Sequence, residues 1–294
     1  MTSLQGKVVL ITGGARGIGA EVARRLRNKG AKLVVIDLGK DELAAIAAEL
    51  GDDERVLTVV ADVRDLPAMQ AAAGQAVERF GGIDVVVANA GIASYGSVLQ
   101  VDPEAFKRVL DVNVLGVFHT VRATLPAVID RRGYVLIVSS LAAFAAPPGM
   151  ASYDMSKAGV EHFANSLRLE VAHFGVGVGC AHMSWIDTAL VRDTRSDLPS
   201  FDQLLARLPW PLNKTTSVNK CAAAFVKGIE GRDPRVYCPD WVGLFRWLKP
   251  VLSTRLGEFP IRRTVAELMP RMDAEVAALG RSTSAYTQGL EKRP

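Results

Sequence analysis

The chain has 294 residues, 49% of them hydrophobic, and this length predicts one domain with a sizeable core and appendages rather than two independent domains. Its 35 basic and 31 acidic residues are scattered, and no run of them resembles a nucleic-acid-binding surface. We therefore expect a globular protein with no nucleic-acid partner.

The cysteines and the first residues indicate a compartment. Cys180, Cys221 and Cys238 are odd in number and far apart, which fits neither a disulfide framework nor a zinc site. The four histidines are also dispersed, so no metal site is predicted. The opening MTSLQGK lacks the pattern of a signal peptide, and no stretch has eighteen consecutive apolar residues. These features predict a cytoplasmic protein with reduced thiols.

Short β-branched apolar runs alternate with Ala-rich amphipathic stretches from residue 7 to about 182. This pattern is typical of parallel strands joined by crossover helices, and it predicts a doubly wound, Rossmann-like α/β sheet. The predicted strands cover residues 7–12, 32–36, 56–60, 83–88, 134–139, 176–182 and 235–237.

Two segments depart from this rhythm. Residues 188–216 contain Pro199, Pro209 and Pro211 and mixed polarity, which predicts an irregular flap. From Trp241 the pattern changes again. We therefore predict a single Rossmann-like domain over residues 1–240 and a C-terminal extension over 241–294 that is not an independent domain.

A glycine-rich turn joins the first predicted strand to the next helix. Gly13, Gly17 and Gly19 are spaced within the sequence TGGARGIG. Glycines let the backbone approach a pyrophosphate, and a helix N-terminus offers unpaired N–H groups and partial positive charge. The turn predicts a dinucleotide site, with a loop that binds no ligand as the alternative, because the spacing is not GxGxxG.

Asp37 closes the second predicted strand. A carboxylate there can accept hydrogen bonds from both ribose hydroxyls of the adenosine half, and it would repel a 2′-phosphate. Arg16 favours the other choice, because a guanidinium in the turn could pair with that phosphate, but a solvated loop residue is its commoner role. We predict NAD(H) rather than NADP(H).

Six motifs in chain order give the sequence a family resemblance. They are TGGARGIG at 12–19, Asp62-Val63, Asn89-Ala90-Gly91, Asn113, Ser140, and Tyr153 with Lys157. Over residues 5 to about 190 the chain resembles the short-chain dehydrogenase/reductases. One departure is Met183-Ser184, where the family usually has Pro-Gly, and it changes backbone freedom and bulk beside the nicotinamide.

The resemblance implies a role for several residues. Asp62 and Val63 would hold the adenine, residues 89–91 would line the adenosine ribose side, and Thr188 would bond the nicotinamide carboxamide. The complete predicted cofactor set is Gly13, Arg16, Gly17, Ile18, Gly19, Asp37, Asp62, Val63, Asn89, Ala90, Gly91, Tyr153, Lys157 and Thr188.

The predicted catalytic residues fit a hydride transfer. Such a step needs a base near the alcohol hydroxyl and a group that holds the developing oxyanion. Lys157 follows Tyr153 by four residues, so both side chains share a helix face, and a nearby cation lowers a phenol pKa. Ser140, at a strand end, can donate to the substrate oxygen. By the resemblance, Asn113 would hold a water that links Lys157 to solvent.

These residues predict an oxidoreductase that moves a hydride between NAD(H) and a secondary alcohol or ketone, with Tyr153 as acid and base. The alternatives are an NADP(H)-dependent ketone reductase and a non-catalytic NAD(H)-binding sensor. Asp154 is expected to point away from Tyr153, because side chains at i and i+1 on a helix do not face each other.

Apolar side chains suggest two further surfaces. The helix that begins near Ser152 carries apolar residues around much of its circumference, which predicts a homodimer or homotetramer, as the family resemblance also implies. Residues 241–252 combine eight large apolar side chains with Arg246 and Lys249. Packing on protein is favoured for this segment, while covering the substrate cleft and peripheral membrane contact stay open. With the apolar flap, it suggests a lipophilic substrate.

Overall fold

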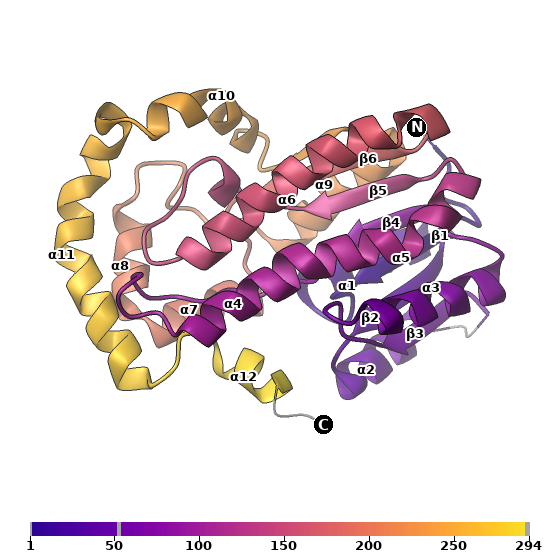
Figure 1. The fold of residues 1–294 in the computed structure, drawn as a ribbon, viewed down its shortest axis with the longest axis horizontal. Coiled ribbons are helices and arrows are strands. Elements are labelled where there is room, and N and C mark those ends of the chain that lie inside the picture. The colour runs from indigo at the N-terminus through magenta and orange to yellow at the C-terminus, as the bar shows by residue number, and fades with distance from the viewer. Residues whose placement is uncertain (1, 52–53, 292–294) are drawn as a thin grey trace.

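The computed structural model describes residues 2–51 and 54–291, and its centre is a seven-stranded parallel sheet in the order β3-β2-β1-β4-β5-β6-β7 (Figure 1). The strands are β1 (Val8–Thr12), β2 (Lys32–Asp37), β3 (Val56–Val60), β4 (Val85–Ala88), β5 (Tyr134–Val138), β6 (Gly177–Met183) and β7 (Arg235–Cys238). All seven predicted strands are present, with ends that differ by at most two residues. The doubly wound, Rossmann-like fold is confirmed.

Helices cover both faces of the sheet, which is why the strands are apolar on both sides. Alternate residues of β1 face opposite layers: Val9 and Ile11 pack into one core cluster, and Val8 and Leu10 into the other. The first layer contains α1 (Gly17–Asn28), α2 (Lys40–Leu50) and α9 (Val218–Gly231). The second contains α3 (Leu66–Phe80), α5 (Gly116–Asp130) and α6 (Ala151–Glu170).

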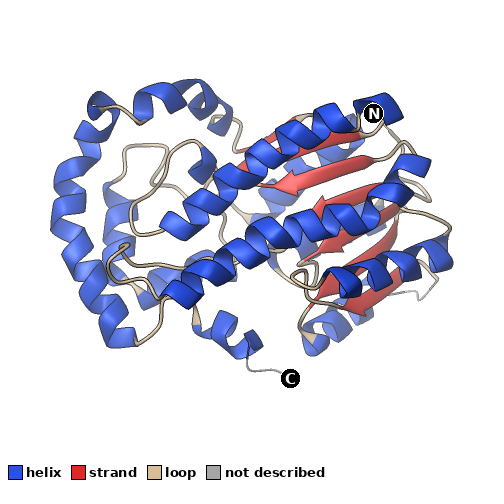
Figure 2. Ribbon diagram, viewed as in Figure 1, coloured by secondary structure: helices blue, strands red, loops and turns tan. Residues whose placement is uncertain are grey.

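The strand direction defines one functional edge. Figure 2 shows the strand arrows all pointing toward the side of the molecule on which the C-terminal helices lie. The carboxyl ends of β1, β4, β5 and β6 therefore open toward those helices, and this is the edge at which doubly wound sheets bind ligands.

One long helical run leads from that edge across the sheet. It consists of α4 (Pro103–Leu110), the π-helical segment η1 (Asp111–Leu115) and α5. By length and composition it is the one helix among the described residues that could cross a membrane, with 39% of its most apolar window buried. Val117, Val121 and Val128 pack into the core beside the sheet, as expected for a core helix of a globular protein.

The segment predicted to be an irregular flap is instead largely helical. It contains α7 (Ala189–Asp197) and α8 (Pro199–Arg207). Pro199 occupies the first turn of α8, where its missing N–H breaks no helical hydrogen bond. Leu198, Phe201 and Leu204 are buried in a cluster with the C-terminal extension, so tertiary packing stabilises helices that proline content argued against.

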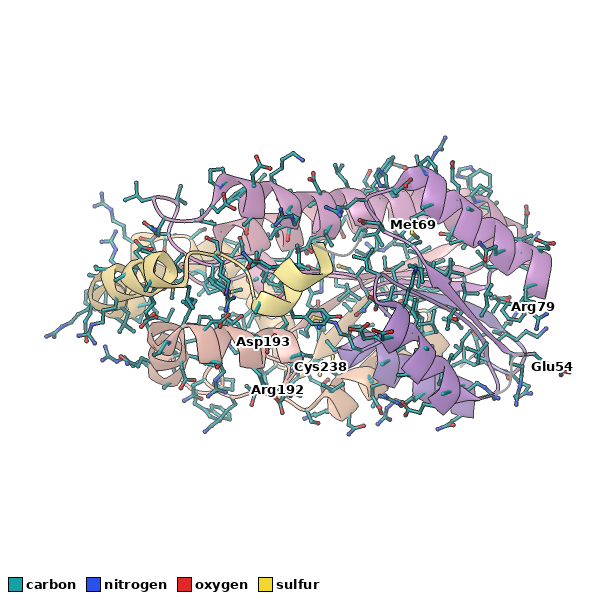
Figure 3. All side chains as sticks on the ribbon, turned by 90° about the horizontal axis from the view of Figure 1, so that it is seen from below. Glu54, Met69, Arg79, Arg192, Asp193 and Cys238 are labelled. Atoms are coloured by element: carbon teal, nitrogen blue, oxygen red, sulfur yellow. The ribbon has the colours of Figure 1, made fainter. Side chains whose placement is uncertain are left out.

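The C-terminal extension forms α10 (Val242–Leu252), α11 (Arg255–Leu279) and α12 (Ala285–Glu291). In Figure 1 these helices run around the outside of the flap and return toward the sheet. Leu268, Met272 and Val276 of α11 are buried against the flap cluster. Figures 1 and 3 both draw α12 beside α7, whose Arg192 and Asp193 are labelled in Figure 3.

Candidate active site

The glycine turn is a cradle that larger residues cannot form. Gly13 and Gly17 have φ angles of 60° and 57°, in the left-handed region that favours glycine. A Cβ on Gly13 would lie 2.8 Å from the Cα of Ala90. The amide of Asn89 donates to the carbonyl oxygens of Thr12 and Gly13 at 3.1 and 3.0 Å, so the loop after β4 holds the turn in place. This closely packed turn at a helix N-terminus fits a dinucleotide pyrophosphate.

Asp37 lies directly beside that turn. Its Oδ2 accepts a hydrogen bond from the backbone N–H of Ala15 at 3.0 Å, and its Oδ1 accepts one from Leu38 at 2.8 Å. Arg16 does not pair with Asp37: its guanidinium lies 3.5 Å from the ring centroid of Tyr286 in α12. Tyr286 in turn donates to Glu42 at 3.0 Å, so the C-terminal helix contacts the mouth of the nucleotide cleft.

Asp62 and Val63 follow β3 at the same edge. Arg64 binds both carboxylate oxygens of Asp62, with a closest distance of 2.6 Å, and its backbone N–H also donates to Oδ1. Val63 is buried against Gly116. The structure thus brings both residues to the edge of the sheet, but Asp62 already has a cationic partner.

Ser140, Tyr153 and Lys157 converge at the carboxyl ends of β5 and β6. The Ser140 hydroxyl donates to the carbonyl of Met183 at 3.4 Å and accepts from the N–H of Ala142 at 3.2 Å, and Ser140 and Tyr153 line the same cavity. The ammonium of Lys157 is buried, donates to the carbonyl of Val138 at 3.0 Å, and lies 5.4 Å from the Tyr153 ring centroid. The i, i+4 spacing therefore gives the shared face that the sequence predicts.

Burial controls the protonation of this pair. Burial raises the pKa of Tyr153 to about 12, although the neighbouring Ser140 hydroxyl acts to lower it. Burial also lowers the pKa of Lys157 to about 8. The direction for the phenol is opposite to the lowered pKa expected from Lys157, because desolvation dominates and the ammonium is directed toward the Val138 carbonyl.

Asn113 is buried in the π-helical segment η1, and its side chain is fully engaged. Its Oδ1 accepts from Ile92 N–H at 2.9 Å, while its Nδ2 donates to Ile92 O at 2.9 Å and to Ser156 Oγ at 3.0 Å. A π turn interrupts the regular helical ladder, and such turns are frequent at functional sites. The side chain thus connects the loop after β4 to α6. Its Oδ1 and the Lys157 Nζ flank the same glycine, because a Cβ on Gly91 would lie 3.3 and 3.5 Å from them.

Thr188 precedes the first residue of α7, without a capping hydrogen bond from its side chain, and lies near the glycine turn. A Cβ on Gly17 would lie 3.8 Å from its methyl carbon, and its hydroxyl donates to the carbonyl of Ile186 at 3.4 Å. Met183 is buried at the end of β6, and the next residue, Ser184, has a buried hydroxyl with no hydrogen-bond partner among the described residues. The two residues that replace the family's Pro-Gly thus lie in the wall of the site.

A cavity of about 850 Å³ extends from this site to the C-terminal extension. Ile18, Ser140, Tyr153 and Thr188 line its inner end. Its other walls are largely apolar and come from three segments: the loop after β5, the flap and the extension. Representative lining residues from these segments are Phe144, Pro147, Leu190, Phe201, Leu204, Phe245, Leu252 and Ile261.

Asp154 follows Tyr153 on α6 and is predicted to point away from it. Both residues nevertheless line the same cavity, and the negative charge of an ionised Asp154 raises the pKa of the phenol. Its Oδ1 is buried without a hydrogen-bond partner among the described residues, and burial raises the pKa of its carboxyl to about 8. Adjacent side chains both reach the cavity because it surrounds the first turn of α6.

The comparisons with known proteins agree with this geometry. A family model described as short chain dehydrogenase matches residues 7–199, which is more than half of the chain. The chain therefore belongs to the short-chain dehydrogenase/reductases, a family of oxidoreductases that use NAD(P) and small-molecule substrates.

Several named relatives cover most of the same region. The oxidoreductase UcpA of Salmonella typhimurium is 36% identical, over 68% of this chain and 78% of its own. An uncharacterized NAD-dependent oxidoreductase of Mycobacterium tuberculosis is 33% identical, over 64% and 74%. The cis-2,3-dihydrobiphenyl-2,3-diol dehydrogenase of Paraburkholderia xenovorans is 39% identical, over 60% and 66%.

Solved structures share the fold. A short-chain dehydrogenase/reductase from Burkholderia phymatum in complex with NAD superposes with a TM-score of 0.74 at 24% identity, covering 84% of this chain and 94% of that one. The 3-ketoacyl-(acyl-carrier-protein) reductase of Brucella melitensis, complexed with NADH, gives a TM-score of 0.70 at 28% identity, covering 80% and 97%.

Proposed function

We propose that this protein transfers a hydride between NAD(H) and a lipophilic secondary alcohol or ketone, with Tyr153 as general acid and base. The observation that carries the proposal is that Ser140 and Tyr153 line a large apolar cavity, while the buried Lys157 ammonium lies 5.4 Å from the Tyr153 ring centroid. A proton-transfer group beside a substrate-sized space at the carboxyl edge of a doubly wound sheet meets the requirements for an active site.

The cofactor would lie along the edge from Asp37 to Thr188. The glycine turn would hold the pyrophosphate, Asp37 the adenosine ribose, and Thr188 the carboxamide. Residues 89–91, Asp62 and Val63 would line the adenosine side. A cofactor bound by these residues would supply the hydride acceptor for alcohol oxidation or the hydride donor for ketone reduction, and its oxidised form would add a positive charge to the site.

The chain's own residues would manage the proton. During reduction, Tyr153 donates its phenolic proton to the substrate oxygen. Its pKa of about 12 in the folded protein without ligands keeps it protonated at neutral pH. Ser140 donates a hydrogen bond to the same oxygen. During oxidation, the phenolate takes the alcohol proton, and the Lys157 ammonium stabilises that anion while it stays protonated.

The cofactor preference rests on Asp37 and Arg16. The Asp37 carboxylate is held beside the glycine turn by Ala15 N–H, where it can bind ribose hydroxyls and repel a 2′-phosphate. Arg16 is stacked on Tyr286 instead of projecting freely, which reduces its availability to pair with that phosphate. These two contacts favour NAD(H) over NADP(H).

The direct test is reduction of NAD⁺, followed at the nicotinamide absorbance, with a panel of secondary alcohols that runs from short and polar to polycyclic and long-chain. We expect turnover, and catalytic efficiency that increases with the apolar size of the alcohol. Binding of NAD⁺ without turnover on any alcohol or ketone would instead identify a sensor. Higher efficiency with NADP(H) would overturn the assignment of Asp37.

A further inference from the structure

The two helices that close the cavity meet at an exposed apolar corner. One face of α10 packs on the protein, with Val242 buried in a cluster that Phe245 also contacts. The opposite face and the start of α11 expose the large side chains Leu244, Trp247, Val251, Leu256 and Phe259, the last two being 77% and 76% exposed. We refer to these five residues as the corner patch. In Figure 1 the corner between α10 and α11 lies on the outer rim of the molecule.

The segment that carries the corner patch is also cationic. Residues 241–265 contain five basic side chains and one acidic one, Glu258, which gives a net charge of +4. This equals the net charge of the entire protein, so the remaining residues balance one another. Arg255 and Arg263 are exposed, and Arg246 lies 4.9 Å from the ring centroid of Trp247. Lys249 is the exception, because it lines the cavity and pairs with Glu161 at 3.8 Å. The exposed arginines Arg255, Arg262 and Arg263 therefore supply the cationic side chains beside the corner patch.

The same segment forms a wall of the cavity. Leu248, Leu252 and Ile261 line the cavity, and in sequence they alternate with the outward-facing Trp247, Val251 and Phe259. The loop after α8 adds a second exposed tryptophan, Trp210, which is preceded by the cavity-lining Pro209. A surface that covered the corner patch would therefore lie against the outer wall of the cavity.

The charge around the corner patch indicates which kind of surface it contacts. In a two-fold contact between copies of this chain, the patch would face itself and bring two segments of charge +4 together, which is unfavourable. A bilayer with anionic lipids can bind both kinds of side chain: tryptophan, leucine and phenylalanine enter the acyl boundary, while the exposed arginines stay at the headgroups. Apolar burial and electrostatic attraction then act together.

We propose that the corner patch docks this protein peripherally on anionic membranes, so that the apolar cavity is held at the bilayer surface. The docking itself does not depend on the reaction. The consequence that lipophilic substrate passes from the bilayer to the cavity rests on the proposed function.

Vesicle co-sedimentation tests the docking. Full-length protein is mixed with vesicles of phosphatidylcholine alone or of phosphatidylcholine with phosphatidylserine, at low and high salt. We expect binding that requires phosphatidylserine and weakens at high salt. The double variant Trp247→Glu/Phe259→Glu should bind at least about tenfold more weakly, as should Arg255→Glu/Arg263→Glu. Leu99→Glu, at a 96% exposed leucine outside the patch, is the matched control and should bind like the wild type.

Other outcomes would overturn the proposal. Equal binding by all variants, no binding to either vesicle, or equal loss in the Leu99→Glu control would each exclude docking through the corner patch. Concentration-dependent self-association that Trp247→Glu/Phe259→Glu abolishes, without vesicle binding, would assign the patch to a second copy of the chain. Circular dichroism and thermal unfolding establish that each variant is folded. Turnover on a short, water-soluble alcohol separately tests the proposed reaction, which can fail while docking holds.

Discussion

At the residue scale, Tyr153 is the group on which the proposed reaction depends. Tyr153→Phe removes the proton donor but keeps the ring, so we expect folding and NAD(H) binding to persist while turnover falls at least about a hundredfold. Tyr134→Phe is the matched control, because that buried hydroxyl donates to Asp233 O and does not line the cavity. Near-normal turnover of the Tyr153 variant would exclude it as the acid and base.

Asp37 sets the predicted cofactor preference. Asp37→Ser removes the carboxylate that would repel a 2′-phosphate, so the ratio of kcat/KM for NAD(H) to that for NADP(H) should decrease by about tenfold or more. Steady-state kinetics with both cofactors measures this ratio. Asp41→Ser, at an exposed carboxylate on α2, should leave it unchanged. An unchanged ratio in the Asp37 variant would contradict the assignment.

Asp154 makes stability depend on pH. Its carboxyl pKa is about 8 in the folded protein, against an ordinary value of 3.8 in an unfolded chain. Between these values the folded protein binds more protons than the unfolded chain, so the free energy of unfolding contributed by Asp154 falls as pH rises from about 4 to about 8. Lys157 has the opposite effect in a different pH range. Between about pH 8, its pKa in the folded protein, and its ordinary pKa of 10.5, its contribution to the free energy of unfolding rises with pH.

Asp154→Asn removes the first of these contributions. The variant should gain stability relative to the wild type as pH rises from about 5 to about 8, in urea unfolding followed by circular dichroism. Asp41→Asn, which changes an exposed carboxyl, should follow the wild type. Parallel pH profiles for Asp154→Asn and the wild type would mean that Asp154 is not held protonated by burial.

At the element scale, the extension is fastened to the flap by a charged contact. Arg281, after α11, binds both carboxylate oxygens of Asp197 in α7 at 2.6 and 2.7 Å and donates to Tyr95 Oη at 2.8 Å. Ser282, Thr283 and Ser284 beside it are buried. We propose that residues 241–294 complete the cavity of a unit formed by residues 1–240 rather than fold alone.

Arg281→Ala tests this attachment. It leaves the Asp197 carboxylate largely buried without its cation, so we expect a loss of about 2 kcal/mol in the free energy of unfolding. Arg262→Ala, which removes an exposed i, i+4 pair with Glu258, should cost less than about 0.5 kcal/mol. A double-mutant cycle with Asp197→Ala isolates the pair, and a coupling energy near zero would show that the contact does not attach the extension.

At the scale of the whole molecule, α6 carries the predicted contact between subunits. Met155 and Leu169 on α6 and Phe118 on α5 are exposed, and the rings of Phe118 and Phe163 meet edge to face. We predict a homodimer or homotetramer through this surface, because its apolar side chains exceed what the sheet side buries. Light scattering at micromolar concentration should give more than one subunit, and Leu169→Glu should reduce the mass. A monomeric wild type would exclude the assembly.

Local signals in the chain were enough to predict the sheet, the glycine turn and the spacing of the catalytic residues. A parallel strand buried on both faces is a continuous apolar run, a turn with positive φ selects glycine, and an i, i+4 pair shares a helix face. Accordingly, all seven strands were predicted, and Tyr153 and Lys157 lie together in the structure.

Long-range packing, in contrast, determines which side chains surround that core site. Arg16 contacts Tyr286, which lies near the other end of the sequence. Helix α8 forms despite its proline because α11 buries its apolar face. Asp154 reaches the cavity because the cavity surrounds the start of α6. Each result depends on contacts between segments distant in sequence. Local propensity carries no information about such contacts, because their free energy arises only when the whole chain packs.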